Sequence, residues 1–183
     1  RDVAPSRGLG DVYKRQEADS LFAEVDSCYS RLKKRAALSS VSLSIVSELK
    51  SGSAWYVPGG RSTIGRLFND ACGCYVFSED KHSGSIPLAF ETVFDKAGDA
   101  DVWTIKYNRD RDMTYADLKA DYMGYTGFKA FKTRNIYGCN TAKVPFYEET
   151  PFRPDYLLAD LIQILHPEIG DLGGLRYFCK LNE

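Results

Sequence analysis

The stretch Val41–Ser62, VSLSIVSELKSGSAWYVPGGRS, decides the fold because the spacing of its apolar residues changes within it. Residues 41–45 alternate apolar and polar side chains, which predicts a β-strand. Residues 54–57 predict a second strand, which a Pro-Gly-Gly sequence ends. Ser62 is a favourable N-cap for a helix over residues 63–72, with a glycine just past its end. The stretch therefore predicts strand, turn, strand and helix in succession.

The same alternation continues on both sides of this stretch. Residues 17–38 carry apolar side chains at helical spacing and basic side chains near their end, so they predict one helix. Further strands are expected at residues 74–77, 101–106 and 135–138. Further helices are expected after Pro87, after Thr114, where Thr114-x-x-Asp117 resembles a capping box, and after Pro154, where the leucines from 157 to 165 and Ile162 face inward. Strands that alternate with helices predict an α/β lobe of three layers around a mainly parallel sheet.

Composition excludes several classes of protein. The 183 residues include 24 Lys and Arg against 25 Asp and Glu, so there is no basic excess for non-specific nucleic-acid binding. No run of apolar residues reaches the length of a membrane span. Cys72 and Cys74 form the only close cysteine pair, and no second pair or spaced histidine completes a zinc site. We therefore expect no metal, no cofactor and no catalytic residue.

Candidate ligand-binding residues lie where strands end. In an open parallel sheet, ligands bind beyond the carboxyl ends of the strands, and the loops 58–62, 107–111 and 139–143 are expected there. Backbone N–H groups of the glycine-bearing loop suit an anion, and aromatic faces suit a large flat ligand, although a tight turn and core packing are the alternative roles. The candidates are Trp55, Tyr56, Gly59, Gly60, Arg61, Lys106, Tyr107, Asn108 and Asn140.

Residues 1–16 are expected to lie outside the fold. Asp11–Gln16, DVYKRQ, is the in-frame translation of GATGTGTATAAGAGACAG, which resembles the end sequence inserted by transposase-based library preparation. We expect residues 1–16 to be such an artefact or a disordered tail. Residues 17–183 are then a piece of a longer protein.

Several motifs, in their order along the chain, resemble the C-terminal lobe of the periplasmic substrate-binding proteins of iron-siderophore, haem and vitamin B12 ABC importers. They are AWYVPGG at 54–60, GSIPLAFETV at 84–93 and ADVW at 100–103, and the endings FYEETPFRPD at 146–155, DLI at 160–162, HPE at 166–168 and LRYF at 175–178 resemble members from Bacteroidetes-type bacteria. Members of this family hold a ligand between two α/β lobes that one long helix joins. The resemblance implies that residues 39–183 are the C-terminal lobe, that residues 17–38 are the end of the joining helix, and that the N-terminal lobe is missing.

The function implied by the resemblance is not enzymatic. It is that of the solute-binding component of an ABC importer, which captures an iron-siderophore, haem or corrinoid and delivers it to a membrane permease. The implied location is periplasmic or lipid-anchored, with membrane contact only through an anchor on the missing N-terminus. Two other functions stay open. One is an α/β enzyme, such as a metal-chelatase-like relative, that uses the strand-end loops, and the other is a surface receptor that works without a permease.

Glu91 acquires a specific role from the resemblance. The family presents a glutamate at the start of a helix to arginines of the permease, and Glu91 stands at that position in Ala89-Phe90-Glu91-Thr92-Val93. Ala89 departs from the capping residue that is usual there. The alternative role of Glu91 is to stabilise the helix dipole, which is worth about 0.3–1 kcal/mol.

Overall fold

The computed structural model describes residues 6–170 and 172–183. Within that part of the chain, a five-stranded sheet has the order β4-β1-β6-β7-β8 and a smaller sheet has the order β2-β3-β5. In the main sheet, β4, β1, β6 and β7 are parallel, and β8 is antiparallel to β7. The strands are β1 (Ser44–Ser47), β2 (Lys50–Ser51), β3 (Ala54–Pro58), β4 (Cys74–Tyr75), β5 (Ser85–Leu88), β6 (Val102–Tyr107), β7 (Ile136–Asn140) and β8 (Cys179–Lys180).

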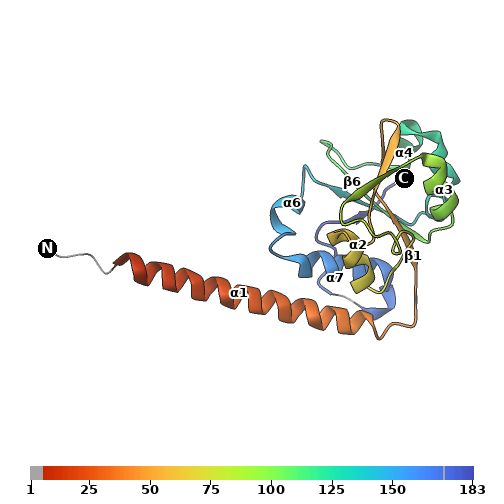
Figure 1. The fold of residues 1–183 in the computed structure, drawn as a ribbon. Helices are drawn as coiled ribbons and strands as arrows, with labels where there is room; N and C mark the ends of the chain where they lie inside the picture. Colours follow the sequence, from red (N-terminus) through yellow and green to blue (C-terminus); the bar gives the residue numbers. More distant parts are fainter. Residues whose placement is uncertain (1–5, 171) are drawn as a thin grey trace.

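Helices cover both faces of the main sheet, which gives the expected α/β layers (Figure 1). The helices α2 and α7 pack on one face, and α3, α5 and the 3-10 helix η1 lie with the small sheet on the other. The bounds are α1 (Ser6–Ala36), α2 (Thr63–Asp70), α3 (Phe90–Ala97), α4 (Tyr115–Asp121), η1 (Met123–Gly127), α5 (Lys129–Lys132), α6 (Phe146–Glu149), α7 (Pro154–Leu165) and η2 (Pro167–Ile169).

An aromatic cluster fixes the small sheet to the main sheet. The ring of Trp55 in β3 lies 5.5 Å from that of Trp103 in β6, and both rings contact Tyr125 and Phe128. Such aromatic pairs contribute about 0.5–1.5 kcal/mol each beyond the area they bury. The two indole N–H groups donate to backbone carbonyls at the end of β1, so no polar group is left unpaired by this packing.

The predicted order of elements is confirmed, with local differences in the bounds of elements and in the sheet to which a strand belongs. The strand predicted at 41–45 begins later and spans Ser44–Ser47. The strand after it, β3, belongs to the small antiparallel sheet. Pro87 does not open a helix: it lies in β5, opposite Tyr56. Because β5 is an edge strand, the missing N–H of Pro87 costs no bond within the sheet, and the helix begins at Phe90.

The end of α2 also differs from the prediction. Gly73 was expected just past the helix end, but α2 ends at Asp70 and Cys72 adopts the left-handed backbone with φ 55°. Gly73 serves a different purpose, because a Cβ there would lie 2.7 Å from Cδ1 of Leu165 in α7. The glycine therefore allows α2 and α7 to approach each other closely.

The helix α1 projects away from the lobe (Figure 1). Its second half packs on α7, with Val25 buried and Tyr29 and Leu32 against the core. At the middle of the helix, Leu21 and Phe22 are 45% and 59% exposed, so the predicted apolar stripe is only partly covered. The helix starts before the predicted residue 17; residues 1–5 lie outside the described residues, and the artefact origin of residues 1–16 stays a prediction.

No helix in the described part of the chain combines the length and the apolar character needed to cross a membrane.

Candidate functional site

The strand order places a topological switch point between β1 and β6. From β1 the chain moves to β4 on one side, returns to β6 on the other side, and continues to β7. The connections that leave β1 and β6 therefore diverge. In open α/β sheets a ligand binds in the crevice that this divergence creates at the carboxyl edge.

Asn140 holds together the loops that follow β6 and β7. Its Nδ2 donates to the carbonyl oxygens of Arg109 (2.8 Å) and Arg111 (3.3 Å), and its Oδ1 accepts from the N–H of Arg109 (3.2 Å). The side chain is almost fully buried. Both ends of the amide are thus bonded inside the protein. Asn140 therefore holds the loop at the edge of the sheet in place without facing the ligand itself.

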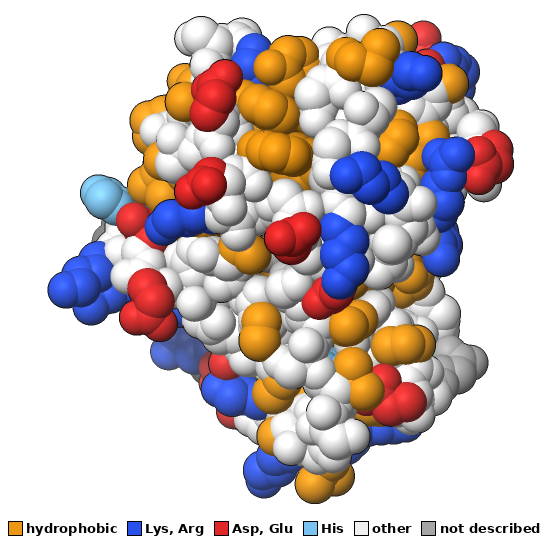
Figure 2. Space-filling model, turned by 90° about the vertical axis from the view of Figure 1, so that its right-hand side faces the viewer, with side chains coloured by type: hydrophobic (Ala, Val, Ile, Leu, Met, Phe, Trp, Pro, Cys, Tyr) orange, Lys and Arg blue, Asp and Glu red, His pale blue; other side chains and the backbone are white. Residues whose placement is uncertain are grey.

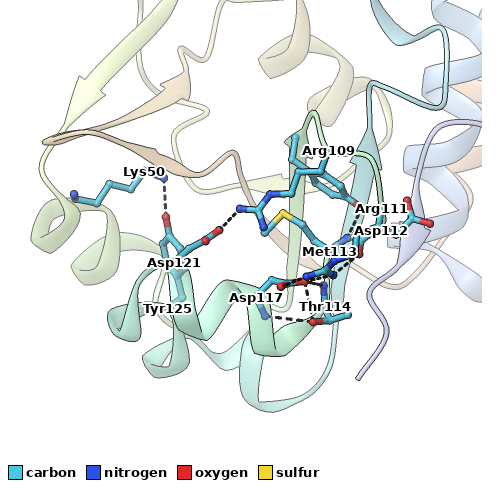
Figure 3. Close-up of polar contacts among 10 residues, drawn as sticks. Lys50, Arg109, Arg111, Asp112, Met113, Thr114, Asp117, Asp121 and Tyr125 are labelled. Carbon is cyan, nitrogen blue, oxygen red and sulfur yellow. Dashed lines mark hydrogen bonds and ion pairs between the residues drawn. The ribbon is translucent and has the colours of Figure 1, made fainter.

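The loop between β6 and α4 neutralises its own charges (Figure 3). Both terminal nitrogens of Arg111 pair with Asp117, at 2.7 and 2.6 Å. Asp117 also accepts from the N–H of Thr114, and the predicted capping box between these two residues is confirmed. The guanidinium and the N–H together hold the pKa of Asp117 well below its usual range. Arg109 pairs with Asp121 through one terminal nitrogen, at 2.6 Å.

Glu48 and Lys106 form an ion pair at the edge between β1 and β6. Lys106 was predicted to lie at the site, whereas Glu48 was not among the candidates. The Nζ atom of Lys106 also lies 5.5 Å from the centre of the Phe146 ring. The sequence gives little indication that Glu48 belongs to the site, because it is a single acidic residue between a strand and a turn.

The three predicted aromatic residues lie in different environments. Trp55 is fully buried in the aromatic cluster, so neither of its faces is open in this structure. Tyr107 is nearly buried; its hydroxyl oxygen accepts from the N–H of Met113 at 3.1 Å, and burial raises its pKa. Tyr56 is 49% exposed because it points away from Trp55 across β3. Only Tyr56 of these three presents a large surface to solvent.

The glycine-bearing loop is tied to the segment 78–84. The N–H of Gly59 donates to Gly84 (2.8 Å) and that of Arg61 donates to His82 (3.1 Å). A Cβ on Gly60 would lie 2.2 Å from the carbonyl oxygen of Ser78. These N–H groups are therefore engaged. The glycines allow the loop to approach segment 78–84 closely, and neither has the positive φ of the tight turn that was the alternative role. The exposed side chain of Arg61 and, after β6, the exposed Asn108 remain open to a ligand.

Glu91 lies apart from the crevice, on the outer side of α3. Ala89 is the N-cap of α3 and offers no side-chain hydrogen bond, as its sequence predicted. Glu91 is exposed and borders a shallow hollow with Phe94, Asp95 and Asp99. Figure 2 looks onto the α3 side of the molecule and shows hydrophobic side chains with acidic ones between them in its upper half.

Two motifs behind the resemblance have structural roles. Asp160 is buried and accepts from the N–H groups of Arg176, Tyr177 and Phe178 at 2.7–3.1 Å, which anchors the C-terminal segment. Burial raises the pKa of Asp160 against the pull of these three N–H groups. His166 is fully buried, and its Nε2 lies 2.7 Å from the carbonyl oxygen of Ala71, which links α7 to the end of α2. Within residues 6–170 and 172–183, no cluster of three or more His, Cys, Asp or Glu side chains is arranged to hold a metal.

This architecture, a mainly parallel sheet with a switch point between β1 and β6 and a long helix leaving the lobe, matches the TroA-like periplasmic binding protein fold. The sequence model of the family described as periplasmic binding protein matches residues 8–142. The chain belongs to this family.

Most of this chain aligns with several known proteins, each of which is longer than this chain. The TroA-like periplasmic binding protein FepB from Veillonella parvula is similar with a TM-score of 0.69 and 15% identity, over 95% of this chain and 58% of that chain. IsdE from S. aureus, complexed with heme, is similar with a TM-score of 0.65 and 19% identity, over 87% of this chain and 61% of that chain. An uncharacterized lipoprotein of Methanocaldococcus jannaschii is 29% identical over 173 residues, 92% of this chain and 39% of the relative. The chain thus spans less than two thirds of the length of each of these proteins.

Proposed function

We propose that the chain is the C-terminal lobe of the solute-binding component of an ABC importer. In this proposal it captures an iron-siderophore, haem or corrinoid between two lobes and delivers it to a membrane permease, at the periplasmic face or from a lipid anchor. The observation that carries the proposal is the β1–β6 switch point, bordered by a loop that Asn140 orders, in a chain of the periplasmic binding protein family. The heme complex of IsdE and the lipoprotein relative support the ligand class and the location.

The proposed ligand contacts divide into two groups. The side chains that reach the surface of the crevice contact the ligand, and those buried behind it hold these contacts in place. The contacting side chains are those of Tyr56, Arg61, Lys106 and Asn108, and the supporting residues are Trp55, Gly59, Gly60, Tyr107 and Asn140.

Ligand binding should need both lobes. One lobe supplies half of the contacts, and an open crevice leaves its polar groups in water, where they interact weakly. Calorimetry with haem, cobalamin and a ferric siderophore should therefore show weak or no binding by residues 17–183 and far tighter binding by the two-lobe protein. Tyr56→Ala should weaken binding by the two-lobe protein, whereas Met123→Ala, which removes an exposed apolar side chain on the α3 side, should not. Equal affinity of the single lobe and the two-lobe protein would contradict the shared site.

Glu91 is proposed to dock on the permease. A charge at such a surface sets association rate and register with a basic partner, and it forms its pair only in the complex. Glu91→Lys should lower ligand uptake into proteoliposomes that contain the permease, while ligand affinity stays unchanged. Glu79→Lys, which changes the net charge equally at another exposed position, is the matched control. Normal uptake with Glu91→Lys would reject the docking role and leave Glu91 its alternative role of stabilising the helix dipole.

A further inference from the structure

One ion pair lies at the switch point itself. Glu48 follows the last residue of β1, and Lys106 is the last but one residue of the adjacent strand β6. Their side chains are 20% and 17% exposed, whereas both members of the Arg109–Asp121 pair on the same edge are about twice as exposed, at 38% and 40%. The pair is thus the most enclosed charge contact among those that border the crevice in the described residues.

The backbone of Glu48 is strained. Its φ is 72°, in the left-handed region that a residue other than glycine occupies at a cost. The conformation is held from both sides, because the N–H of Glu48 donates to Thr104 (2.9 Å) and its carbonyl oxygen accepts from Nε1 of Trp103 (2.9 Å). Glycine would adopt this turn without strain. For stability alone, glycine would be the better residue at this position, yet the chain places a carboxylate there. Strained backbone positions of this kind are typical of functional residues.

The two charges of the pair stabilise each other in surroundings that leave little of either side chain exposed to water. Lys106 lies over the Phe146 ring and, with the buried residues Ser47 and Thr104, lines a small cavity of about 10 Å³. When a half-buried pair in such surroundings is broken, the charge that loses its partner is costly to leave uncompensated. A ligand that binds only one of these two groups is therefore disfavoured.

We propose that Glu48 and Lys106 form a specificity-determining site for a group that presents a hydrogen-bond acceptor and a donor side by side, as a primary carboxamide does. The carboxamide oxygen accepts from the Lys106 ammonium, and the adjacent N–H donates to the Glu48 carboxylate. Both charges then keep a partner when the crevice closes. A ligand carboxylate offers acceptors only, so Lys106 attracts it while Glu48 repels it.

This inference rests on the proposed function and narrows its substrate class to chelates with carboxamide side chains, in preference to those with carboxylate side chains. Two probes match in ring and metal and differ in the groups that end their side chains. The side chains of dicyanocobinamide end in amides, mostly primary ones, and those of dicyanocobyrinic acid end in carboxylates. The measurement is the ratio of their affinities for the two-lobe protein, by calorimetry, with haem as a third ligand.

The wild-type protein should prefer the amide probe. Glu48→Gln removes the repulsion, so it should lower the affinity ratio of amide to carboxylate probe by about tenfold, which corresponds to about 1.4 kcal/mol. The matched control is Lys129→Gln, which breaks the ion pair with Asp101 at the opposite edge of the same sheet, and it should leave the ratio unchanged. Lys106→Gln should weaken binding of both probes.

The possible failures separate the two proposals. If the wild-type protein binds the probes and Glu48→Gln leaves their ratio unchanged, the pair is structural and this inference falls while the proposed function stands. A wild-type preference for the carboxylate probe would also overturn the inference alone. If the wild-type protein binds neither probe, nor haem, nor a ferric siderophore, the proposed function falls and this inference falls with it.

Discussion

The helices α3 and α4 begin in opposite ways, although each carries an acidic side chain in its first turn. At α4, the carboxylate of Asp117 is bonded to Thr114 and to both terminal nitrogens of Arg111. At α3, Ala89 offers no cap, and Glu91 has no hydrogen-bond or ion-pair partner among the residues that the structure describes. The first carboxylate stabilises a loop, and the second stays available to another molecule.

This difference follows from what each helix start borders. The loop before α4 lines the crevice, where a rigid border lowers the entropic cost of binding. The start of α3 lies on the outer surface, where a closed cap would occupy the carboxylate. An acidic residue in a first helical turn therefore indicates a function only once its internal partners are known.

The largest expected effect is at Asn140, because its side chain holds the loop that leads into α4. Asn140→Ala removes several buried hydrogen bonds and leaves backbone groups of the loop unpaired, so it should lower the free energy of unfolding by about 2–4 kcal/mol. Urea denaturation measures the change. Asn108→Ala is the control, because this exposed side chain makes one hydrogen bond, to Thr141, and should cost less than about 1 kcal/mol. Equal losses for the two variants would show that Asn140 does not organise the loop.

A smaller effect is expected from the α4 cap, and it should depend on pH. Asp117→Asn should cost about 1–2 kcal/mol at neutral pH, because it weakens the cap and removes the pair with Arg111. The folded state lowers the pKa of Asp117 from 3.8, so its contribution is present above pH 3.8 and is lost as pH falls through the lowered pKa. The difference between wild type and variant should therefore shrink in acid. A pH-independent difference for Asp117→Asn would contradict the pairing.

A gain of stability is expected when the open helix start is closed. The backbone of Ala89, at φ −69° and ψ 152°, already has the extended conformation of an N-cap. Ala89→Ser should therefore raise the free energy of unfolding by about 0.5–1 kcal/mol, measured by thermal or urea denaturation. Ala116→Ser, at an exposed position inside α4, should give no gain. If Ala89→Ser also gives no gain in stability, the start of α3 lacks more than a capping side chain.

The smallest effect is expected at a third helix start, that of α1. Deletion of residues 1–16 should leave the thermal midpoint unchanged, since the side chains of residues 14–16 are exposed and the packing of α1 on α7 lies in its second half. A drop of more than about 4 °C would show that the segment contributes about 1 kcal/mol or more to stability.

The sequence alone predicted those features that depend on neighbours along the chain. The N-cap Ser62, the capping box at Thr114 and the apolar face of α7 are of this kind, and all three are present. The positions of glycine and proline were less informative about where helices begin and end. Pro87 lies in an edge strand and Gly73 marks a close approach between helices, because both roles are set by distant parts of the chain.

Features set by strand register could not be predicted in this way. Glu48 and Lys106 are 58 positions apart and meet because Ser47 pairs with Thr104 across β1 and β6. Trp55 and Tyr56 are adjacent in sequence, and only the attachment of β3 to the aromatic cluster decides which of them is buried. The candidate list therefore included Lys106 while leaving out its partner Glu48.

The length of α1 turns small motions into large ones. From residue 17, where the predicted helix begins, to Ala36 it spans about 30 Å, and its packing on α7 holds only the end nearer the lobe. A rod held at one end behaves as a lever: a tilt of about 5° at the support moves the far tip by about 3 Å over this length. A sub-ångström shift of α7 would thus be amplified at the tip. The stiffness of the α1–α7 contact therefore limits how accurately anything attached to the far end of α1 is positioned, and a change at the crevice that reaches α7 would be transmitted there mechanically.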